Sequence, residues 1–306
     1  MSDYAIYDVF TGTALAGNPL AVVFDADRFD DAQMQAIARE FNLSETVFVR
    51  AADNAAHTAK LRIFTPGREL PFAGHPTVGA AVALAHRRLG ASVPGNGIDL
   101  VKMLEEGIGP VRCAVRIDRE DAGFAEFDLP RLSQRSQVEI MREDVGAALG
   151  LDPHEIGFEN HEVSLWSAGV PFMLVPVHDM AAVAKAECDA GLWERVAPMA
   201  DGQLALTYVY CRGGKHHTAH FHARMFAPGE GIAEDPATGS AVAALSGAIH
   251  GYDGLRDGHH SLVIEQGVEM GRPSLIHLHL DCTGWELSHA RIGGEAVRVA
   301  EGRLLV

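Results

Sequence analysis

The chain has 306 residues, which is long for one compact core and suits two domains of about 150 residues each. Hydrophobic residues make up 47% and charged residues 22%, a composition typical of a soluble globular protein. The 25 basic and 41 acidic residues give a net charge of −16. This charge argues against a nucleic-acid partner, because neutralising phosphates requires a basic stripe.

The N-terminal residues 1–10 carry acids where a signal peptide carries a basic region followed by an apolar run. No stretch approaches the roughly 18 apolar residues that cross a bilayer. We therefore expect a cytoplasmic protein with no membrane partner. The cysteines are too far apart for a CxxC site, so we expect buried thiols rather than disulfides or a thiolate metal site. They are Cys113, Cys188, Cys211 and Cys282.

The first predicted elements flank a Ser-Glu pair. From Asp30 to Phe41, apolar residues recur at i, i+3, i+4 and i+7, which predicts an amphipathic helix with an Asp cap. The β-branched and aromatic run 46–49 predicts a strand. Ser44 and Glu45 are therefore expected where the chain leaves the helix and enters the strand.

The next elements are a strand at 60–64, a Pro-Gly turn, a loop to His75-Pro76 and a Gly/Ala-rich helix over 77–89. Proline suits a helix start, because its missing N–H would have no partner there. The small residues predict a helix that packs closely against surrounding structure, such as a sheet curled around it. The second half repeats this succession with strand 220–226, Asp235-Pro236 and helix 238–250.

The rest of the chain gives weaker predictions. The polar span 118–130 is the expected crossover between domains, and 290–306 reads as short strands that return to the first domain. We expect one domain from 1–118 plus 290–306 and a second from 119–289. The stretch 132–168 and the His-rich stretch 215–222 carry no pattern that we can interpret, and substrate choice could lie there.

The chain contains an internal repeat. Three blocks recur in the same order at nearly constant spacing, which is hardly a matter of chance. The matched blocks are 62–67 with 224–229, 75–83 with 235–243, and 105–108 with 265–268. Two copies suggest a pseudo-twofold arrangement, with His75 and Asp235 at matching helix entrances.

Each repeated helix should present unpaired N–H groups and the positive end of its dipole at its start. If the two helix starts face one another, they form a cleft suited to a carboxylate. Small residues there would let a substrate approach the backbone, namely Gly74, Gly79, Gly239 and Ser240.

Proton transfer at carbon needs a base beside the substrate. Glu45 is followed by the apolar Val47 and Phe48. Burial would raise the pKa of a Glu from its reference of about 4.3 towards neutrality, the range useful to an acid/base.

The motifs around these residues closely resemble the PhzF-like family of phenazine biosynthesis over essentially the whole chain. They are DVFT at 8–11, GNPLAV at 17–22, FNLSETVF at 41–48, FTP at 64–66, ELPFAGHPT at 69–77 and EDPATGSA at 234–241. The resemblance implies an α+β, diaminopimelate-epimerase-like fold of two pseudo-symmetric domains. Each domain would be a curled sheet around a central helix, with the active site between the two.

The same resemblance implies a cofactor-independent isomerase that is often a homodimer and acts on a small acid. It implies that Glu45 is the acid/base and that His75 and Asp235 relay or position protons. The substrate would be held by Asn18, Ser44, Gly74, Gly239 and Ser240.

Other functions remain possible from the residues alone. By the same resemblance, a racemase of this fold would use two facing cysteines, and here the helix entrances carry His75 and Asp235 instead. A metal enzyme could use the histidines His216, His217, His220 and His222. A binding protein that kept the fold without the reaction would be expected to lose Glu45, His75 or Asp235. A nucleotide site is disfavoured, because Gly12 to Gly17 is not followed by the Lys-Ser/Thr of a P-loop.

Overall fold

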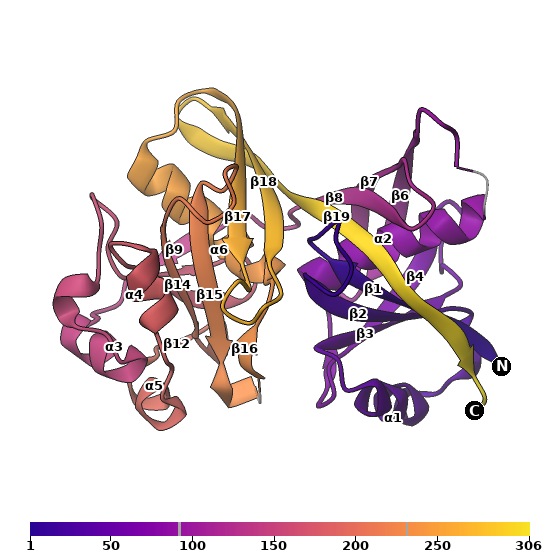
Figure 1. Ribbon diagram of the computed structural model, residues 1–306, viewed down its shortest axis with the longest axis horizontal. Coiled ribbons are helices and arrows are strands. Elements are labelled where there is room, and N and C mark those ends of the chain that lie inside the picture. The colour runs from indigo at the N-terminus through magenta and orange to yellow at the C-terminus, as the bar shows by residue number, and fades with distance from the viewer. Residues whose placement is uncertain (91–92, 231) are drawn as a thin grey trace. The chain divides into compact units, whose positions relative to one another are not determined.

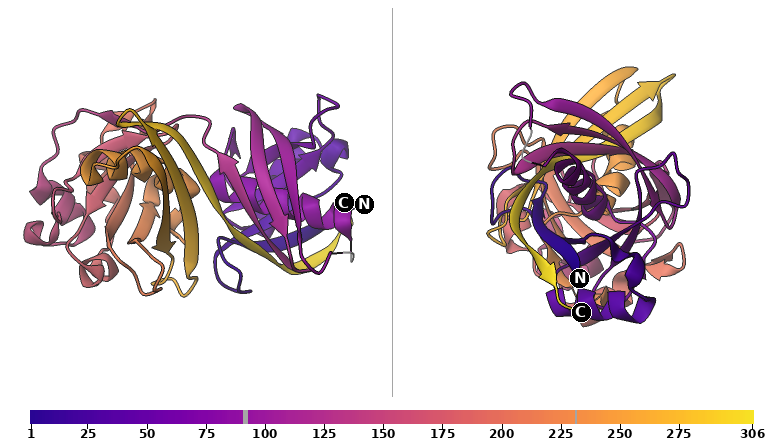
Figure 2. Two further views of the ribbon diagram at one scale, coloured as in Figure 1. Left: turned by 90° about the horizontal axis from the view of Figure 1, so that it is seen from above. Right: turned by 90° about the vertical axis from the view of Figure 1, so that its right-hand side faces the viewer.

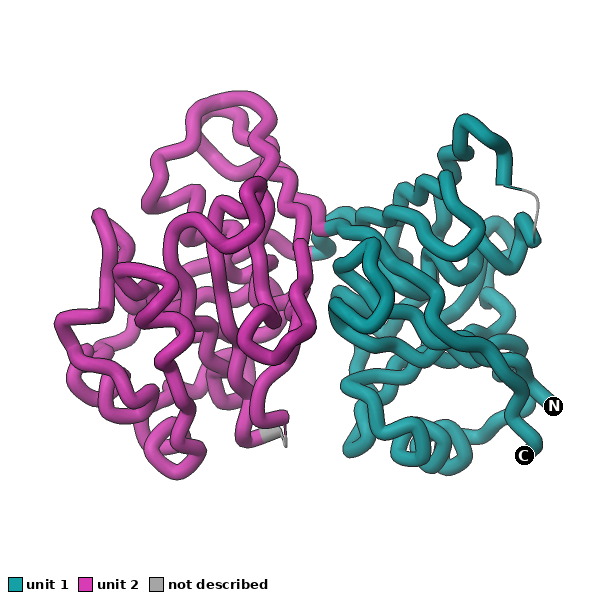
Figure 3. Tube along the Cα trace, in the orientation of Figure 1, with its two compact units in different colours: residues 1–130, 293–306 teal, residues 131–292 magenta. Residues whose placement is uncertain are grey.

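The computed structural model describes residues 1–90, 93–230 and 232–306. The chain divides into two compact units, shown in separate colours in Figure 3. Unit 1 comprises Met1–Pro130 with Gly293–Val306, and unit 2 comprises Arg131–Ile292. Each unit is described by itself below. Within the described residues, no helix is both long enough and apolar enough to span a membrane.

Unit 1 is a sheet that curls around one helix. Its strands are β1 (Ser2–Val9), β2 (Asn18–Val23), β3 (Glu45–Arg50), β4 (Ala59–Phe64), β5 (Glu69–Leu70), β6 (Ile98–Glu106), β7 (Gly109–Ile117), β8 (Ala122–Asp128) and the C-terminal part of β19 (Glu286–Leu304). Its helices are α1 (Asp31–Phe41), α2 (Gly74–Leu89) and the short η1 (Ala26–Arg28).

The sheet of unit 1 closes on itself. Strands β1 to β4 pair in chain order, β4 pairs in parallel with β6, and β6, β7 and β8 form antiparallel neighbours. The final strand β19 pairs with both β8 and β1, so no free edge is left between the first and last strands. Figure 1 shows β19 crossing this sheet, and the right view of Figure 2 shows the strands around the central helix.

Helix α2 is the core of this curled sheet, as its small residues predicted. It contacts β1, β2, β3, β6, β7 and β8, and the side chains from Val78 to Ala83 are all buried. Glycine is required at position 79, because a Cβ there would lie 2.5 Å from Leu20 Cδ2 and 2.8 Å from Val9 Cγ2. A larger residue would force α2 away from β1 and β2.

Helix α1 covers a second cluster in unit 1. It begins with the predicted Asp30 cap, in a capping box with Gln33, and it buries Met34, Ile37 and Ala38. These side chains pack on Phe48 and Phe64 of the sheet. The predicted amphipathic helix and the strand that follows it are confirmed.

Unit 2 is built from the remaining elements. Its strands are β9 (Gln134–Ser136), β10 (Ser164–Ser167), β11 (Pro171–Pro176), β12 (Met199–Ala200), β13 (Gln203–Leu204), β14 (Leu206–Arg212), β15 (Phe221–Ala227), β16 (Ile232–Asp235), β17 (Gly258–Gln266) and β18 (Ser274–Thr283). Its helices are α3 (Arg142–Leu149), α4 (Met180–Lys185), α5 (Ala190–Val196), α6 (Gly239–Asp253), η2 (Pro153–Glu155) and η3 (Pro228–Glu230).

The two units share one strand topology. In unit 2, β10–β11 is antiparallel, β11–β14 parallel, β14–β15 antiparallel, β15–β17 parallel and β17–β18 antiparallel. In unit 1, β1–β2, β2–β3, β3–β4, β4–β6 and β6–β7 show the same alternation. Helix α6 contacts β9, β10, β11 and β18, as α2 contacts its own sheet. The repeat in sequence is therefore also a repeat in folding pattern.

Two sequence predictions need correction. The span 118–130 was expected to be a crossover, but it contains β8, whose buried Ala122, Ala125 and Phe127 pack in the core of unit 1. The C-terminal residues form one long strand, β19, rather than several short strands. Its pairing with β1 shifts register between Ile6 and Tyr7, where one residue of β19 is left without a partner position.

Candidate active site

Glu45 stands at the first position of β3, as its place between helix and strand predicted. Asn42 adopts the left-handed conformation (φ 50°) that ends α1, and the chain turns through Leu43 and Ser44 into the strand. Glu45 lies opposite Leu20 in the parallel pair of β2 and β3. Its side chain is only 14% exposed, so the carboxyl group is mostly withdrawn from water.

His75 lies in the first turn of α2, although the sequence predicted that the helix starts at Thr77. Ala73 is the N-cap, and Gly74, His75 and Pro76 are the first helical residues, where a proline costs no hydrogen bond. His75 is 4% exposed. Burial lowers the pKa of His75 to about 3, against the opposing hydrogen bond to the Pro19 carbonyl, so the ring is neutral.

The two ring nitrogens of His75 have different roles. Nε2 forms no hydrogen bond within the described part of the chain, so the N–H that reaches the Pro19 carbonyl is on Nδ1. A neutral ring with its hydrogen on Nδ1 leaves Nε2 as an acceptor. Nε2 lies 3.4 Å from Oε2 of Glu45. A proton taken up by Glu45 would therefore find an acceptor at Nε2 of His75.

In unit 2, Asp235 ends β16 and is oriented by a buried network. Thr238 donates its hydroxyl to Oδ2 of Asp235 at 2.5 Å. Gln266 donates its amide to the Asp235 carbonyl at 2.8 Å and to Thr238 Oγ1 at 3.0 Å. Its own oxygen accepts from Thr238 N–H and from the Tyr208 hydroxyl. The conformation of the 235–238 segment is therefore firmly held.

The predicted binding residues fall in two groups, one in each unit. Asn18 is fully buried at the start of β2, next to Pro19, and Gly74 adjoins His75. Gly239 and Ser240 are the first two residues of α6. Within unit 1 the structure thus brings together Glu45, His75 and Gly74.

His75 and Asp235 do not occupy the same place relative to their helices, which corrects the prediction of matching entrances. His75 is inside the first turn of α2, whereas Asp235 lies before Thr238, the N-cap of α6. The Thr238–Gln266 network keeps the Asp235 segment extended, and that is why α6 begins later in its copy.

The repeat also extends to a pair of loop-binding carboxylates. Glu105 accepts the N–H groups of Asp53 and Asn54, both at 2.8 Å. Glu265 accepts those of Lys215 and His216, at 2.8 and 2.7 Å. These acids hold equivalent loops before β4 and β15, so their role is structural.

The histidine cluster considered for a metal is arranged differently from a ligand set. His216, His217 and His220 are exposed, whereas His222 is fully buried. Burial alone would lower the pKa of His222, but hydrogen bonds to Glu265 and Glu269 raise it to about 9. Both ring nitrogens therefore donate to carboxylates, at 2.6 and 3.0 Å, and neither offers a lone pair to a cation.

One group of potential ligands has its charge balanced by an arginine. Glu159, His161 and Asp253 place donor atoms within 4.8 Å of one another. The guanidinium of Arg212 donates to Glu159 and to Asp253, and Nε2 of His161 donates to Oδ1 of Asp253 at 2.9 Å. A salt-bridge network thus accounts for this cluster.

The cysteines do not form a two-thiol site. Cys113 and Cys211 are fully buried, on β7 in unit 1 and on β14 in unit 2. Burial raises the pKa of Cys211 to about 12 and raises that of Cys113 further. Both are therefore unreactive thiols at neutral pH.

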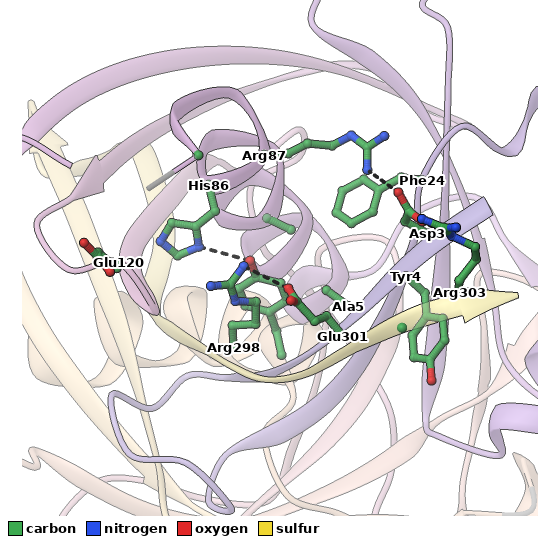
Figure 4. A pocket seen from close by; sticks show the side chains of 14 residues that line it. Asp3, Tyr4, Ala5, Phe24, His86, Arg87, Glu120, Arg298, Glu301 and Arg303 are labelled. Carbon is green, nitrogen blue, oxygen red and sulfur yellow. Dashed lines mark hydrogen bonds and ion pairs between the residues drawn. The ribbon is translucent and has the colours of Figure 1, made fainter. Parts of the chain in front are cut away.

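A cavity of about 770 Å³ lies at the other end of α2, around His86 and Arg87 (Figure 4). Its arginines are already neutralised by acids. Arg298 donates to Glu301 and Arg303 to Asp3. The lining includes none of the motif residues, so we do not place the chemistry there.

Three further residues were not singled out from the sequence. Thr77 and Glu106 form a buried pair beside His75, and Gln266 organises Asp235. The signal was available in the repeat, where Glu106 and Gln266 are matched positions. It could not be interpreted without knowing which way the side chains point.

Residues 7–302 match the family model described as "Phenazine biosynthesis-like protein". An uncharacterized isomerase of Mesorhizobium japonicum is 55% identical, with 99% of each chain covered. The trans-2,3-dihydro-3-hydroxyanthranilate isomerase of Pseudomonas chlororaphis is 33% identical, with 100% of each chain covered.

Solved structures show the same fold. A phenazine biosynthesis protein of the PhzF family from Bacillus anthracis matches with a TM-score of 0.86 at 24% identity, covering 100% of this chain and 99% of that one. A hydroxyproline epimerase from Agrobacterium vitis matches with a TM-score of 0.62 at 13% identity, covering 99% and 90%. The predicted α+β, epimerase-like fold is therefore confirmed, and the chain belongs to the phenazine biosynthesis-like (PhzF) family of isomerases.

Proposed function

We propose that this isomerase works without a cofactor and moves a proton at a carbon atom of a small, carboxylate-bearing substrate, with Glu45 as the general acid/base. The observation that carries the proposal is the placement of Glu45 Oε2 at 3.4 Å from Nε2 of the neutral, buried His75. Membership of the family indicates an isomerase, and the Glu45–His75 pair offers a site at which a proton can be taken up and returned.

The pair suits a group that must both accept and return one proton. In its ionised form, Glu45 takes the proton from the substrate carbon. The resulting carboxylic acid can donate to Nε2 of His75, whose Nδ1–H is fixed by the Pro19 carbonyl. Because the pKa of His75 is about 3, the ring acts as an acceptor that holds the acid, and the proton stays on Glu45 for return.

In the proposed reaction, unit 2 contributes Asp235, Gly239 and Ser240. The carboxylate of Asp235 is aimed by Thr238, and the start of α6 presents backbone N–H groups suited to an anion. We assign Asp235 a role in positioning protons and the two α6 residues a role in holding the substrate, together with Asn18 and Ser44 of unit 1. The related trans-2,3-dihydro-3-hydroxyanthranilate isomerases make a cyclic amino acid the first substrate to test.

Isotope incorporation tests the role of Glu45. Candidate cyclic acids incubated with the wild type in D₂O should gain deuterium at a defined carbon, located by NMR. Glu45→Gln is nearly isosteric and should lower this exchange by about 10²–10⁴-fold, the usual contribution of a general acid/base. Its thermal unfolding should remain close to that of the wild type.

Glu40→Gln is the matched control, because it makes the same change at an exposed position of α1. Exchange at the wild-type rate in Glu45→Gln would remove Glu45 from the mechanism. A catalytically silent binding protein is the alternative, and it would bind a candidate acid in calorimetry without any deuterium incorporation. By family resemblance we also propose a homodimer, for which light scattering should give the mass of two chains.

A further inference from the structure

Glu106 is a buried acid that the proposed reaction does not use. It is the last residue of β6, is 8% exposed and lies against the first turns of α2. Oε1 lies 2.9 Å from the Thr77 hydroxyl, and Oε2 makes no hydrogen bond within the described residues. No cation of the described chain forms an ion pair with it. An ionised carboxylate in such a place would lack compensation.

The hydrogen of Thr77 decides the protonation state of Glu106. The Thr77 hydroxyl oxygen is 2.7 Å from the Ala73 carbonyl and 2.9 Å from Glu106 Oε1. A hydroxyl has one hydrogen, and the carbonyl can only accept. If that hydrogen points to Ala73, the second short contact requires a hydrogen from Glu106. A protonated Glu106 therefore satisfies both contacts, whereas an ionised one leaves two oxygen atoms opposed.

The internal repeat provides an independent comparison. Gln266 occupies the position that matches Glu106, and its amide donates to Thr238 Oγ1 at 3.0 Å. Glutamine has the shape of a protonated glutamate and cannot ionise. A protonated Glu106 would thus repeat in unit 1 the kind of bond that Gln266 donates to a threonine in unit 2, although Thr77 and Thr238 are not themselves matched positions.

The electrostatic surroundings agree with a neutral Glu106. Burial raises the pKa of Glu106 to about 8, against the opposing hydrogen bond from Thr77. From β7, Cys113 faces it as an uncharged thiol. A cavity of about 560 Å³ adjoins it, and the charged groups of that lining pair with each other: His57 with Glu105, Lys60 with Asp53, and Arg62 with Glu69.

We propose that Glu106 is a positioning residue that acts as a neutral hydrogen-bond donor to Thr77 and thereby fixes the first turn of α2, which carries His75. The link to turnover rests on the function proposed above, whereas the protonation state does not. Ionisation would make Glu106 compete with the Ala73 carbonyl for the single hydrogen of Thr77. The first turn of α2 would then lose a bond beside His75.

Glu106→Gln tests the proposal, because it installs the residue that the second copy already has. Infrared spectra of the wild type at about pH 7 should contain a protonated-carboxyl band that titrates near pH 8 and is missing in the variant. Since the folded-state pKa is raised, the contribution of Glu106 to wild-type stability should fall as pH rises from about 4.5 to 8. The unfolding constants of the two proteins should diverge about tenfold per pH unit over that window.

The pH dependence of turnover distinguishes a positioning role of Glu106 from a purely structural one, because a purely structural role would leave this dependence unchanged. Wild-type kcat/KM should fall about tenfold between pH 7 and pH 9, as a group with a pKa near 8 ionises, and the fall should be absent in Glu106→Gln. Gln266→Glu is the mirror variant and should introduce a new loss of stability with rising pH.

Two results would overturn the proposal. One is an infrared spectrum in which Glu106→Gln removes only an ionised-carboxylate band at neutral pH. The other is a pair of stability profiles for the wild type and Glu106→Gln that run parallel from pH 4.5 to 8. A failure of deuterium exchange in every candidate substrate would instead count against the proposed function, and these two measurements would still decide the state of Glu106.

Discussion

At the scale of single residues, the candidate site places an uncharged, buried histidine beside Glu45. His75 is neutral, and its Nδ1–H donates to the backbone carbonyl of Pro19. This arrangement lets a weak acceptor orient Glu45 without competing for its proton. Glu106 is likewise uncharged, and its carboxyl group serves as a hydrogen-bond donor.

The neutral state of His75 has a measurable consequence for stability. Because its pKa is lowered in the folded protein, stability should be present above about pH 6.5 and be lost as pH falls towards 3. His75 should contribute a slope of about 1.4 kcal/mol per pH unit in this range. His75→Asn, whose amide can still donate to Pro19, should lack that component in urea unfolding at a series of pH values. Identical slopes in the two proteins would show that His75 is not buried in its neutral form.

The sequence singled out Glu45 and His75, because both lie in motifs with strong local signals. It did not reveal that Nε2 of His75 faces Glu45, since this depends on α2 starting at Gly74 rather than Thr77. At this early start Thr77 closes on the Ala73 carbonyl, and its hydroxyl also contacts Glu106 from a distant strand. Sequence patterns of single elements cannot report such contacts.

At the scale of elements, the repeat places the same residue in two different settings. Arg62 and Arg224 each bind a glutamate in a bidentate pair, Glu69 and Glu234 respectively. Arg62 also reaches Asp31 of α1, at the surface. Arg224 instead donates to three carbonyls at the end of α4, including that of Ala186 at 2.7 Å.

Matched substitutions should separate these settings. Arg224→Met leaves buried carbonyls and Glu234 without their donor, and we expect a loss of about 3–5 kcal/mol in the free energy of unfolding. Arg62→Met disrupts a more exposed pair and should cost about 1 kcal/mol or less. Denaturant unfolding of both variants measures the difference. Equal losses would mean that α4 does not depend on Arg224.

The sequence predicted the elements around the motifs, namely α1 with its cap, β3, β4, β15 and both central helices, within a few residues. It failed for β8, because the polar residues of 118–121 concealed the short alternating strand that follows. It also failed for the length of β19, whose continuity depends on pairing with strands at the opposite end of the chain. Long-range pairing of this kind leaves no local pattern.

At the scale of the whole molecule, the two chain ends are neighbours. Ser2 pairs with Leu304 where β1 meets β19, and the left view of Figure 2 shows the termini together. Adjacent termini allow a chain to be joined end to end and opened elsewhere. The exposed turn at Asp201 and Gly202, between β12 and β13, is a suitable new opening.

A circular permutant opened between Asp201 and Gly202 should therefore fold and retain activity, because every pairing of β1 and β19 is preserved. A permutant opened between Ala81 and Val82 breaks the buried α2 and should fail to fold. Circular dichroism and deuterium exchange of the two proteins provide the comparison. Loss of structure in the first permutant would show that β12 and β13 are essential to unit 2.

The course of β19 also bears on how the protein emerges from the ribosome. Residues 131–292 form a contiguous unit, whereas residues 1–130 need 293–306 to close their sheet. Unit 1 thus begins with the first residues to be synthesised, but its sheet cannot be completed until the last residues are available. Until residues 293–306 have been synthesised, the edges of β1 and β8 remain open to pairing with other nascent chains, and pairing with β19 closes them.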